Sequence, residues 1–314
     1  MDAVLFEKAG DPAEVLAFGA VDAPRLAAGQ VLVAVEARPI HPADLAFIRG
    51  TYRVLPQFPQ VAGLSGGGRV VAAAPAVPLT PGTRVAFRWP GAWAEQVAVP
   101  VERTFVVPDD IAMQDAAQLP LNPITAWGLL DVADVRPGDV IAITAPTSSV
   151  SRITRALAEA RGIRVIEIGR NGPTSLEIER LRALSAGVGL AALIDSVGGA
   201  LVERLLPELR EGATIVTYGT LSPDPIRVHN AAIVYQNLTW KGFGIDRWLS
   251  ALPLIERARM LDALWNGIRS RTYELPVSSH VPLRDFARGL ALAQTASDGK
   301  VLLAQTQEER TVLP

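Results

Sequence analysis

The stretch DVIAITAPTSSVSRITRALAEARGIRVIEIGR, from Asp139 to Arg170, predicts a strand, a tight turn, a helix and a second strand. The runs 139–144 and 164–168 are short, apolar and rich in β-branched residues, as buried strands are. Apolar residues recur at helical spacing between them, at Val150, Ile153, Ala156, Leu157 and Ala160. Two parallel strands joined by one helix form a right-handed βαβ unit. Because strands and helices continue to alternate after it, the chain predicts an α/β domain with a doubly wound parallel sheet.

The turn of this unit, Ala145 to Ser151, lies where such folds hold the pyrophosphate of a dinucleotide against a helix N-terminus. Glycines are expected in that turn, and this chain has Ser149 and Ser151 instead. A serine at a position that needs left-handed backbone costs roughly 1–2 kcal/mol relative to glycine. Two such changes predict cofactor binding that is weaker by about 10–100-fold. The alternative is a remodelled turn that binds the cofactor differently or not at all.

The first 110 residues predict an all-β architecture. Short apolar runs such as Val31 to Val35 and Val97 to Val99 are separated by proline and glycine. The segment VAGLSGGG, Val61 to Gly68, reads as a tight turn that feeds a strand from Arg69 to Ala73.

The remaining segments predict the end of the parallel sheet and a return to the β-rich part. Leu238 to Phe243 reads as the last strand, 250–272 as one long amphipathic helix, and the tail as a further helix and strand. The predicted division is a first β-rich part at 1–120, a nucleotide-binding part at 121–254 and a return to the β-rich part at 255–314.

Composition argues against several classes of function. The 314 residues carry a net charge of -2, which provides no basic field for nucleic acid or an anionic membrane. The absence of cysteine removes disulfides, thiolate nucleophiles and the cysteine ligands of zinc, and the three histidines show no metal-ligand spacing. No apolar run approaches the ~20 residues of a membrane helix, and the first residues lack the pattern of a secretory signal. We therefore expect a cytoplasmic protein with no metal.

Several segments resemble the medium-chain dehydrogenases/reductases. They are His41-Pro42-Ala43-Asp44, Arg49-Gly50-Thr51-Tyr52, Pro59 to Gly63, Leu121 to Trp127, Val216 to Gly219, Lys241 to Phe243 and Gly299 to Val301. The zinc-free branches fit best because the cysteine-rich structural lobe is missing. The segment Asn122 to Ala126 is most similar to 2-enoyl thioester reductases, with quinone oxidoreductases next. The resemblance implies a Rossmann domain with a doubly wound parallel sheet and a GroES-like β-rich catalytic domain.

The resemblance also implies roles for individual residues. In the enoyl reductases the tyrosine that matches Tyr52 hydrogen-bonds the substrate carbonyl, although chemistry alone would make Tyr52 an ordinary surface residue. The counterpart of Asn122 faces the nicotinamide, whereas helix capping is the simpler explanation for Asn122 and Thr125. The other residues that match cofactor-binding positions are Thr147, Ser148, Ser149, Val150, Tyr218, Gly219, Thr220, Leu221, Phe243 and Lys300.

The choice between NADPH and NADH depends on the end of the second strand. Glu167 has about the spacing from the turn expected of a residue that binds the ribose diol of NAD, but it lies inside the predicted strand. Arg170 and Asn171 stand just past its end, where an arginine can bind a 2′-phosphate. A solvent-exposed loop arginine is the alternative, and we expect NADPH.

The resemblance therefore predicts a metal-free, NADPH-dependent reductase that delivers hydride to a C=C bond conjugated to a carbonyl. Its substrate would be an enoyl thioester, a smaller enone or a quinone. A quinone oxidoreductase is the alternative within enzymes, and a catalytically silent member that binds a small molecule or a protein is the alternative outside them. Zinc-free relatives commonly dimerise through the edge strands of their nucleotide sheets, so we expect a homodimer.

Overall fold

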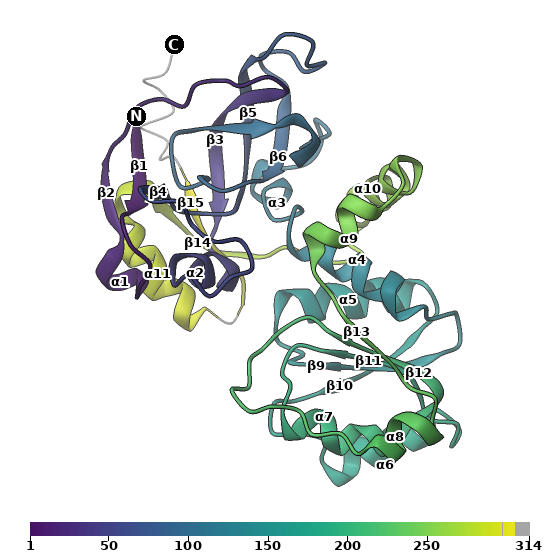
Figure 1. Cartoon of the computed structure of the whole chain (residues 1–314). Coiled ribbons are helices and arrows are strands. Elements are labelled where there is room, and N and C mark those ends of the chain that lie inside the picture. Colours follow the sequence, from purple (N-terminus) through teal and green to yellow (C-terminus); the bar gives the residue numbers. More distant parts are fainter. Residues whose placement is uncertain (297, 305–314) are drawn as a thin grey trace. The chain divides into compact units, whose positions relative to one another are not determined.

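A computed structural model describes residues 1–296 and 298–304 of the chain, which divides into two units (Figure 1). Unit 1 joins the segment that ends at Leu121 to the segment that starts at Leu275, and unit 2 is Asn122–Glu274. The predicted return at residue 255 is therefore too early. The helix that follows residue 253 belongs to unit 2, where it contacts the first helix of that unit.

Unit 2 is built on a five-stranded sheet in the order β10-β9-β11-β12-β13, in which every described pairing is parallel. This confirms the predicted α/β architecture. The strands are β9 (Val140–Thr144), β10 (Arg164–Ile168), β11 (Leu190–Asp195), β12 (Leu209–Thr217) and β13 (Thr239–Gly242). The helices are α4 (Asn122–Ala133), α5 (Ser149–Ala160), α6 (Ser175–Leu184), α7 (Ala200–Leu205), η2 (Leu206–Glu208), α8 (Asn230–Tyr235), α9 (Ile245–Ala251) and α10 (Leu254–Arg269).

Helices cover both faces of this sheet. Figure 1 shows α4 and α5 on one face and α6, α7 and α8 on the other. Apolar side chains of β9, β11 and β12 form the buried centre between these layers. Of the long helix predicted over 250–272, residues 254–269 form α10, and residues 250 and 251 are the end of α9. Pro253 separates them, since proline has no N–H to continue a helix and Leu252 before it is extended.

Unit 1 contains two sheets, one ordered β2-β1-β4 and one ordered β14-β15-β3-β5-β6-β8, with β7 paired to β3. The strands are β1 (Asp2–Phe6), β2 (Ala17–Ala20), β3 (Gln30–Pro39), β4 (Gln60–Val61), β5 (Ser65–Ala73), β6 (Arg84–Arg88), β7 (Gln96–Pro100), β8 (Thr104–Val106), β14 (Val277–Pro282) and β15 (Lys300–Ala304). The helices are α1 (Pro12–Val15), α2 (Pro42–Ile48), η1 (Val101–Arg103), α3 (Met113–Ala116), η3 (Leu283–Asp285) and α11 (Phe286–Thr295). Strand β15 pairs antiparallel with β3, so the end of the described chain completes a sheet begun near its start.

Two predictions for the first part of the chain are wrong. It is not all-β, because α2 begins directly after His41, with a proline in its first turn and the Asp44 carboxylate accepting the His41 N–H at 2.7 Å. The segment 61–68 is not one tight turn, because β5 already starts at Ser65. Its glycines allow close packing, since a Cβ on Gly68 would lie 1.9 Å from a β3 carbonyl oxygen.

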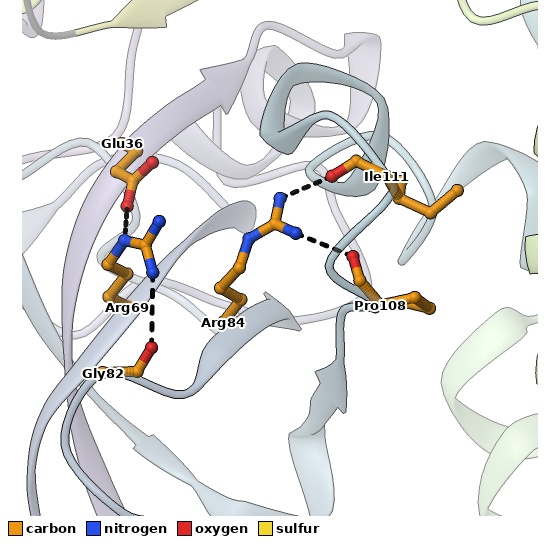
Figure 2. A network of polar contacts seen from close by, with 6 residues as sticks. All are labelled: Glu36, Arg69, Gly82, Arg84, Pro108 and Ile111. Carbon is orange, nitrogen blue, oxygen red and sulfur yellow. Dashed lines mark hydrogen bonds and ion pairs between the residues drawn. The ribbon is translucent and has the colours of Figure 1, made fainter.

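Arginines tie the strands of the larger sheet to neighbouring loops (Figure 2). Arg69 pairs with Glu36 at 3.1 Å and donates to the carbonyl of Gly82. Arg84 donates to the carbonyls of Pro108 and Ile111, which follow β8. These contacts hold β5 and β6 in place, and β6 carries one of the residues of the candidate site.

Candidate functional site

The turn after β9 ends at a capped helix. Ser148 is the N-cap of α5, and its Oγ accepts a hydrogen bond from the backbone N–H of Ser151 at 3.1 Å. Ser149 and Ser151 therefore lie inside the helix, and neither has a positive φ. The prediction of left-handed serines is wrong, because the left-handed residue of this turn is Ala145, with a φ of 50°. The cost of roughly 1–2 kcal/mol for such a residue falls on Ala145.

The hydroxyl groups of Ser148, Ser151 and Tyr218 lie close together next to this turn. The buried Ser151 Oγ donates to the carbonyl of Thr144 and accepts from the Ser148 hydroxyl, both at 2.9 Å. The hydroxyl of Tyr218 lies 3.3 Å from the same Ser151 oxygen. Burial raises the pKa of the Tyr218 phenol, and the hydrogen bonds of the serines act in the opposite direction. Ser151 thus satisfies its own polar atoms within the turn.

The carboxyl ends of β9 and β11 are linked by side chains. Asp195, the last residue of β11, accepts hydrogen bonds from the Thr144 hydroxyl at 2.9 Å and from the backbone N–H groups of Val197 and Gly198. The Thr144 Oγ1 in turn accepts the N–H of Ser196. The strand order reverses between β9 and β11. In open α/β sheets, ligands bind outside the strand ends at this switch point.

The end of β10 carries an exposed arginine. Arg170 follows the strand in a turn, and no residue of 1–296 or 298–304 gives it a hydrogen bond or an ion pair. The neighbouring Asn171 carbonyl accepts from Arg204 at 3.0 Å. Glu167 lies within β10, as predicted from the sequence, and pairs with Arg155 at 3.1 Å. The guanidinium of Arg170 therefore lies at the end of β10 without a partner among the described residues. The Glu167 carboxylate is already paired with Arg155.

The start of α4 contributes a buried amide. Asn122 is 3% exposed, and its Nδ2 donates no hydrogen bond to any described residue. Thr125, one turn later, is also buried. In the β9–α5 turn Thr147 is exposed and Val150 is half-buried. An unpaired buried donor is costly, so Asn122 is suited to bind a ligand that brings an acceptor.

The residues after β12 divide into exposed and packed positions. In Tyr218–Leu221 the last two residues are exposed, whereas a Cβ on Gly219 would lie 2.6 Å from the Ser196 carbonyl oxygen. Phe243 packs against Gly128 of α4, where a Cβ would come within 2.7 Å of its ring. Phe243 therefore has a packing role within unit 2.

Unit 1 contains Tyr52 in the segment that follows α2. Its backbone N–H donates to the carbonyl of Ala46 at 3.1 Å, and the ring is half-buried against the core of the unit. The Nη2 of Arg88 donates a hydrogen bond to the Tyr52 phenol oxygen at 2.8 Å. Arg88 is the last residue of β6 and is 6% exposed.

A buried acid and a buried histidine lie in the same unit. The Asp44 carboxylate accepts the N–H groups of His41 at 2.7 Å and Leu64 at 2.8 Å. Burial raises the pKa of Asp44 to about 6. The two hydrogen bonds and the charges of Arg88 and Lys300 lower this pKa, but by less than burial raises it. Burial, followed by the charges of Lys300 and Arg88, holds the pKa of His41 well below its usual range. Neither ring nitrogen of His41 has a partner among the described residues.

The structure thus places the candidate residues in two groups. Unit 1 holds Tyr52 and Lys300, and unit 2 holds the other cofactor-binding candidates. No site role was predicted from the sequence for Asp44, His41 or Arg88. A charged residue at the end of the apolar run VAF was a usable signal for Arg88, and the proline two residues before Asp44 was one for the helix cap.

The described residues contain no group of three or more histidine, cysteine, aspartate or glutamate side chains able to hold a metal ion. None of the helices in the described ranges is both long and apolar enough to cross a membrane.

Known proteins resemble this chain over more than nine-tenths of its length. Residues 27–109 match the alcohol dehydrogenase GroES-like domain. A mitochondrial enoyl-[acyl-carrier-protein] reductase from Xenopus tropicalis is 32% identical over 93% of this chain and 91% of its own length. A Bacillus thuringiensis structure described as an NADPH:quinone reductase has a TM-score of 0.87 at 25% identity, with 97% of this chain and 99% of that chain covered. A mycobacterial protein solved with NADPH has a TM-score of 0.83 at 25% identity, with 97% and 100% covered.

These matches agree with the two-unit architecture and with the predicted family. The GroES-like match lies within unit 1, and the parallel sheet of unit 2 has the strand order of a nucleotide-binding domain. The chain belongs to the medium-chain dehydrogenase/reductase superfamily of oxidoreductases.

Proposed function

We propose that this protein is a metal-free, NADPH-dependent reductase that transfers hydride to a C=C bond conjugated to a carbonyl, as a 2-enoyl thioester reductase does. The observation that carries the proposal is the pairing of Tyr52 with Arg88 in a chain whose relatives include enoyl reductases. A phenol that accepts from a guanidinium keeps its own proton available for a substrate carbonyl. Bound NADPH supplies the hydride in this chemistry.

The residues of unit 2 fit such a cofactor. The N-terminus of α5 offers backbone N–H groups to the pyrophosphate, next to the Ser148 and Ser149 side chains. The unpaired Nδ2 of Asn122 is a donor suited to the carboxamide of the nicotinamide. The guanidinium of Arg170 is suited to the 2′-phosphate and supports the choice of NADPH. The other proposed contacts in unit 2 are Thr125, Thr147, Val150, Asn171, Tyr218, Gly219, Thr220, Leu221 and Phe243. Lys300 of unit 1 is also proposed as a contact.

Tyr52 would act on the carbonyl of the substrate. As hydride adds to the carbon–carbon double bond, negative charge moves onto the carbonyl oxygen, and a hydrogen bond from the Tyr52 hydroxyl stabilises it there. A preorganised donor of this kind supplies much of the rate gain in carbonyl chemistry. No metal ligand is required for this step.

The experiment is a steady-state assay of NADPH oxidation by the purified protein with a crotonyl thioester and, separately, with a quinone. We expect faster turnover of the thioester. Turnover of the quinone alone would favour the second candidate, an NADPH:quinone oxidoreductase, which the Bacillus thuringiensis structure supports.

A third candidate is a silent family member that binds a small molecule or a partner protein. The observation that favours it is the presence of Ser149 and Ser151 at the start of α5, where glycines are expected because they let a phosphate approach closely. Titration of NADPH fluorescence separates it from the reductase. The absence of binding at high micromolar NADPH would support this candidate and contradict the first two.

Two further properties belong to the same proposal. Strand β13 is an edge strand of its sheet, and a homodimer formed by pairing two copies of this edge is a prediction that light scattering can test. We also predict a cytoplasmic location, which cell fractionation can test, although the Xenopus tropicalis relative is named as mitochondrial.

A further inference from the structure

Arg88 is a charged residue at the end of a buried strand. The three residues before it in β6, Val85 to Phe87, are buried, and Arg88 is itself 6% exposed. It lies opposite Ser65 of β5 in the sheet register. A buried guanidinium is costly unless its N–H groups are hydrogen-bonded. One of them donates to the Tyr52 phenol oxygen at 2.8 Å.

This hydrogen bond determines which part of the phenol remains available. A tyrosine hydroxyl has one proton to donate and lone pairs that accept. The bond from Arg88 occupies a lone pair, and no described residue accepts the Tyr52 proton. The contact therefore fixes the oxygen while the O–H stays available for an outside acceptor.

Two cations, Arg88 and Lys300, act on buried titratable groups of the same unit. Burial, followed by the charges of Lys300 and Arg88, lowers the pKa of His41, so His41 is neutral near pH 7. The charges of Arg88 and Lys300 also act to lower the pKa of Asp44, against the larger effect of burial. The Asp44 carboxylate accepts hydrogen bonds from two backbone N–H groups. The Arg88 guanidinium, 2.8 Å from the Tyr52 oxygen, favours negative charge at that oxygen electrostatically.

We propose that Arg88 is a positioning residue for the reduction: it holds the Tyr52 oxygen so that the phenol proton points to the substrate carbonyl, and its charge stabilises the phenol as that carbonyl becomes negative. This inference rests on the proposed function and adds to it a residue that acts through Tyr52. Charge-assisted hydrogen bonds of this type are stronger than neutral ones.

The test is a double-mutant cycle with Arg88→Met, Tyr52→Phe and the double variant, assayed with NADPH and a crotonyl thioester. We expect R88M to lower kcat by about 10- to 100-fold when Tyr52 is present, the range of one hydrogen bond to a charged group. In the Y52F background the same change is expected to alter kcat less than about twofold, because Arg88 then has no phenol to hold. The KM for NADPH is expected to stay within about twofold, and R88K to recover part of kcat.

Arg84 provides the matched control. It lies on the same strand and donates to the carbonyls of Pro108 and Ile111, as Figure 2 shows. R84M removes a guanidinium from β6 without touching Tyr52, so kcat is expected to remain within about threefold of the wild type. If R88M does not fold, the cycle with R88Q has the same two outcomes.

Failure of this inference and failure of the proposed function give different results. Equal losses of kcat on changing Arg88 in the wild-type and Y52F backgrounds would mean that Arg88 acts only on the structure. A wild type that turns over neither the thioester nor a quinone would instead overturn the proposed function. The NMR signal of ¹³Cζ-labelled Tyr52, identified by its loss in Y52F, then distinguishes the two failures. A displaced signal in R88M confirms the contact, and an unchanged signal refutes it.

Discussion

Tyr52 in unit 1 and Tyr218 in unit 2 are both tyrosines whose hydroxyls meet another side chain, but the partners differ in charge. The oxygen of Tyr52 accepts from the buried guanidinium of Arg88 at 2.8 Å. The hydroxyl of Tyr218 lies 3.3 Å from the neutral hydroxyl of Ser151, which is already bonded to a strand carbonyl. A cation next to a phenol favours negative charge, whereas a neutral hydroxyl does not.

The charge of the hydrogen-bond partner, and not the tyrosine itself, distinguishes these two phenols. Burial raises the pKa of Tyr218, which makes it a poor acid, and its serine neighbours form a closed set of hydrogen bonds. The two residues flagged by family resemblance therefore have different expected roles. Variants in the two regions test whether this difference in surroundings gives a difference in function.

The largest effect is expected from Tyr52→Phe compared with Tyr218→Phe. Y52F removes a donor aimed at developing charge and is expected to lower kcat about 10²- to 10³-fold. Y218F removes one neutral hydrogen bond and is expected to cost about 1 kcal/mol of stability, with a smaller loss of kcat than Y52F. Steady-state kinetics and urea unfolding of both variants provide the measurement. Comparable losses of kcat in the two variants would erase the contrast.

The next effect is a pH dependence of stability that arises from the buried Asp44 of unit 1. The folded-state pKa of Asp44 is raised to about 6 from the ordinary 3.8, so the folded protein binds this proton more tightly than the unfolded chain does. The contribution of this proton to the free energy of unfolding is fully present below about pH 4, and it is lost as the pH rises through about 6. A difference of about a hundredfold in proton affinity corresponds to about 3 kcal/mol.

Asp44→Asn removes that titration. At pH 4 the variant is expected to be less stable than the wild type, because the amide oxygen cannot accept both backbone N–H groups as well as a carboxyl group. The deficit is expected to shrink by about 2 kcal/mol between pH 4 and pH 7, since part of the titration of the unfolded chain lies below pH 4. Urea unfolding at both pH values measures it. Ser151→Ala in the neutral hydroxyl set is the control, and its deficit is expected to be the same at both.

A smaller effect is expected at the end of β10. Arg170→Ala removes a cation proposed to bind the 2′-phosphate, so the Kd for NADPH is expected to rise about 10- to 100-fold while the Kd for NADH changes less than about twofold. Arg180→Ala, an exposed arginine of α6, is the control. Fluorescence titration of both cofactors measures the ratio. Equal weakening of NADPH and NADH would remove Arg170 from the choice between them.

The smallest effect concerns the turn itself. Ala145→Gly is expected to raise the free energy of unfolding by about 1 kcal/mol, because glycine adopts a φ of 50° at less cost than alanine. Ala156→Gly, in the middle of α5, is expected to lower it by a similar amount. Urea unfolding midpoints decide both signs. A loss of stability in A145G would show that the left-handed conformation carries no strain.

The sequence was sufficient to predict the parallel sheet, because strand runs such as 164–168 carry their own apolar and β-branched signal. It failed at α2, where Pro42 and the Asp44 cap outweighed a surrounding β pattern. The glycines of β5 were read as a turn, although they permit close packing against β3. Both errors arise because the same residues are used in two kinds of structure. Proline and aspartate occur in turns and at helix starts, and glycine occurs in turns and in closely packed strands.

The candidate site was predictable only in part. Tyr52 and Arg170 were identified by resemblance and position, but Arg88 meets Tyr52 across 36 residues of sequence, and no periodicity reports such a contact. The position of the left-handed residue was also out of reach, because the serine cap that starts α5 at Ser149 depends on side-chain geometry. Tertiary contacts of this kind cannot be predicted from a short segment of the sequence.

The pairing of β15 with β3 has a consequence for synthesis on the ribosome. Unit 2 is one continuous segment and can fold as soon as it has emerged, whereas the sheet of unit 1 lacks β14 and β15 until the last described residues are translated. The nascent protein must therefore keep the unfinished edge of β3 from aggregating while an entire second unit is made.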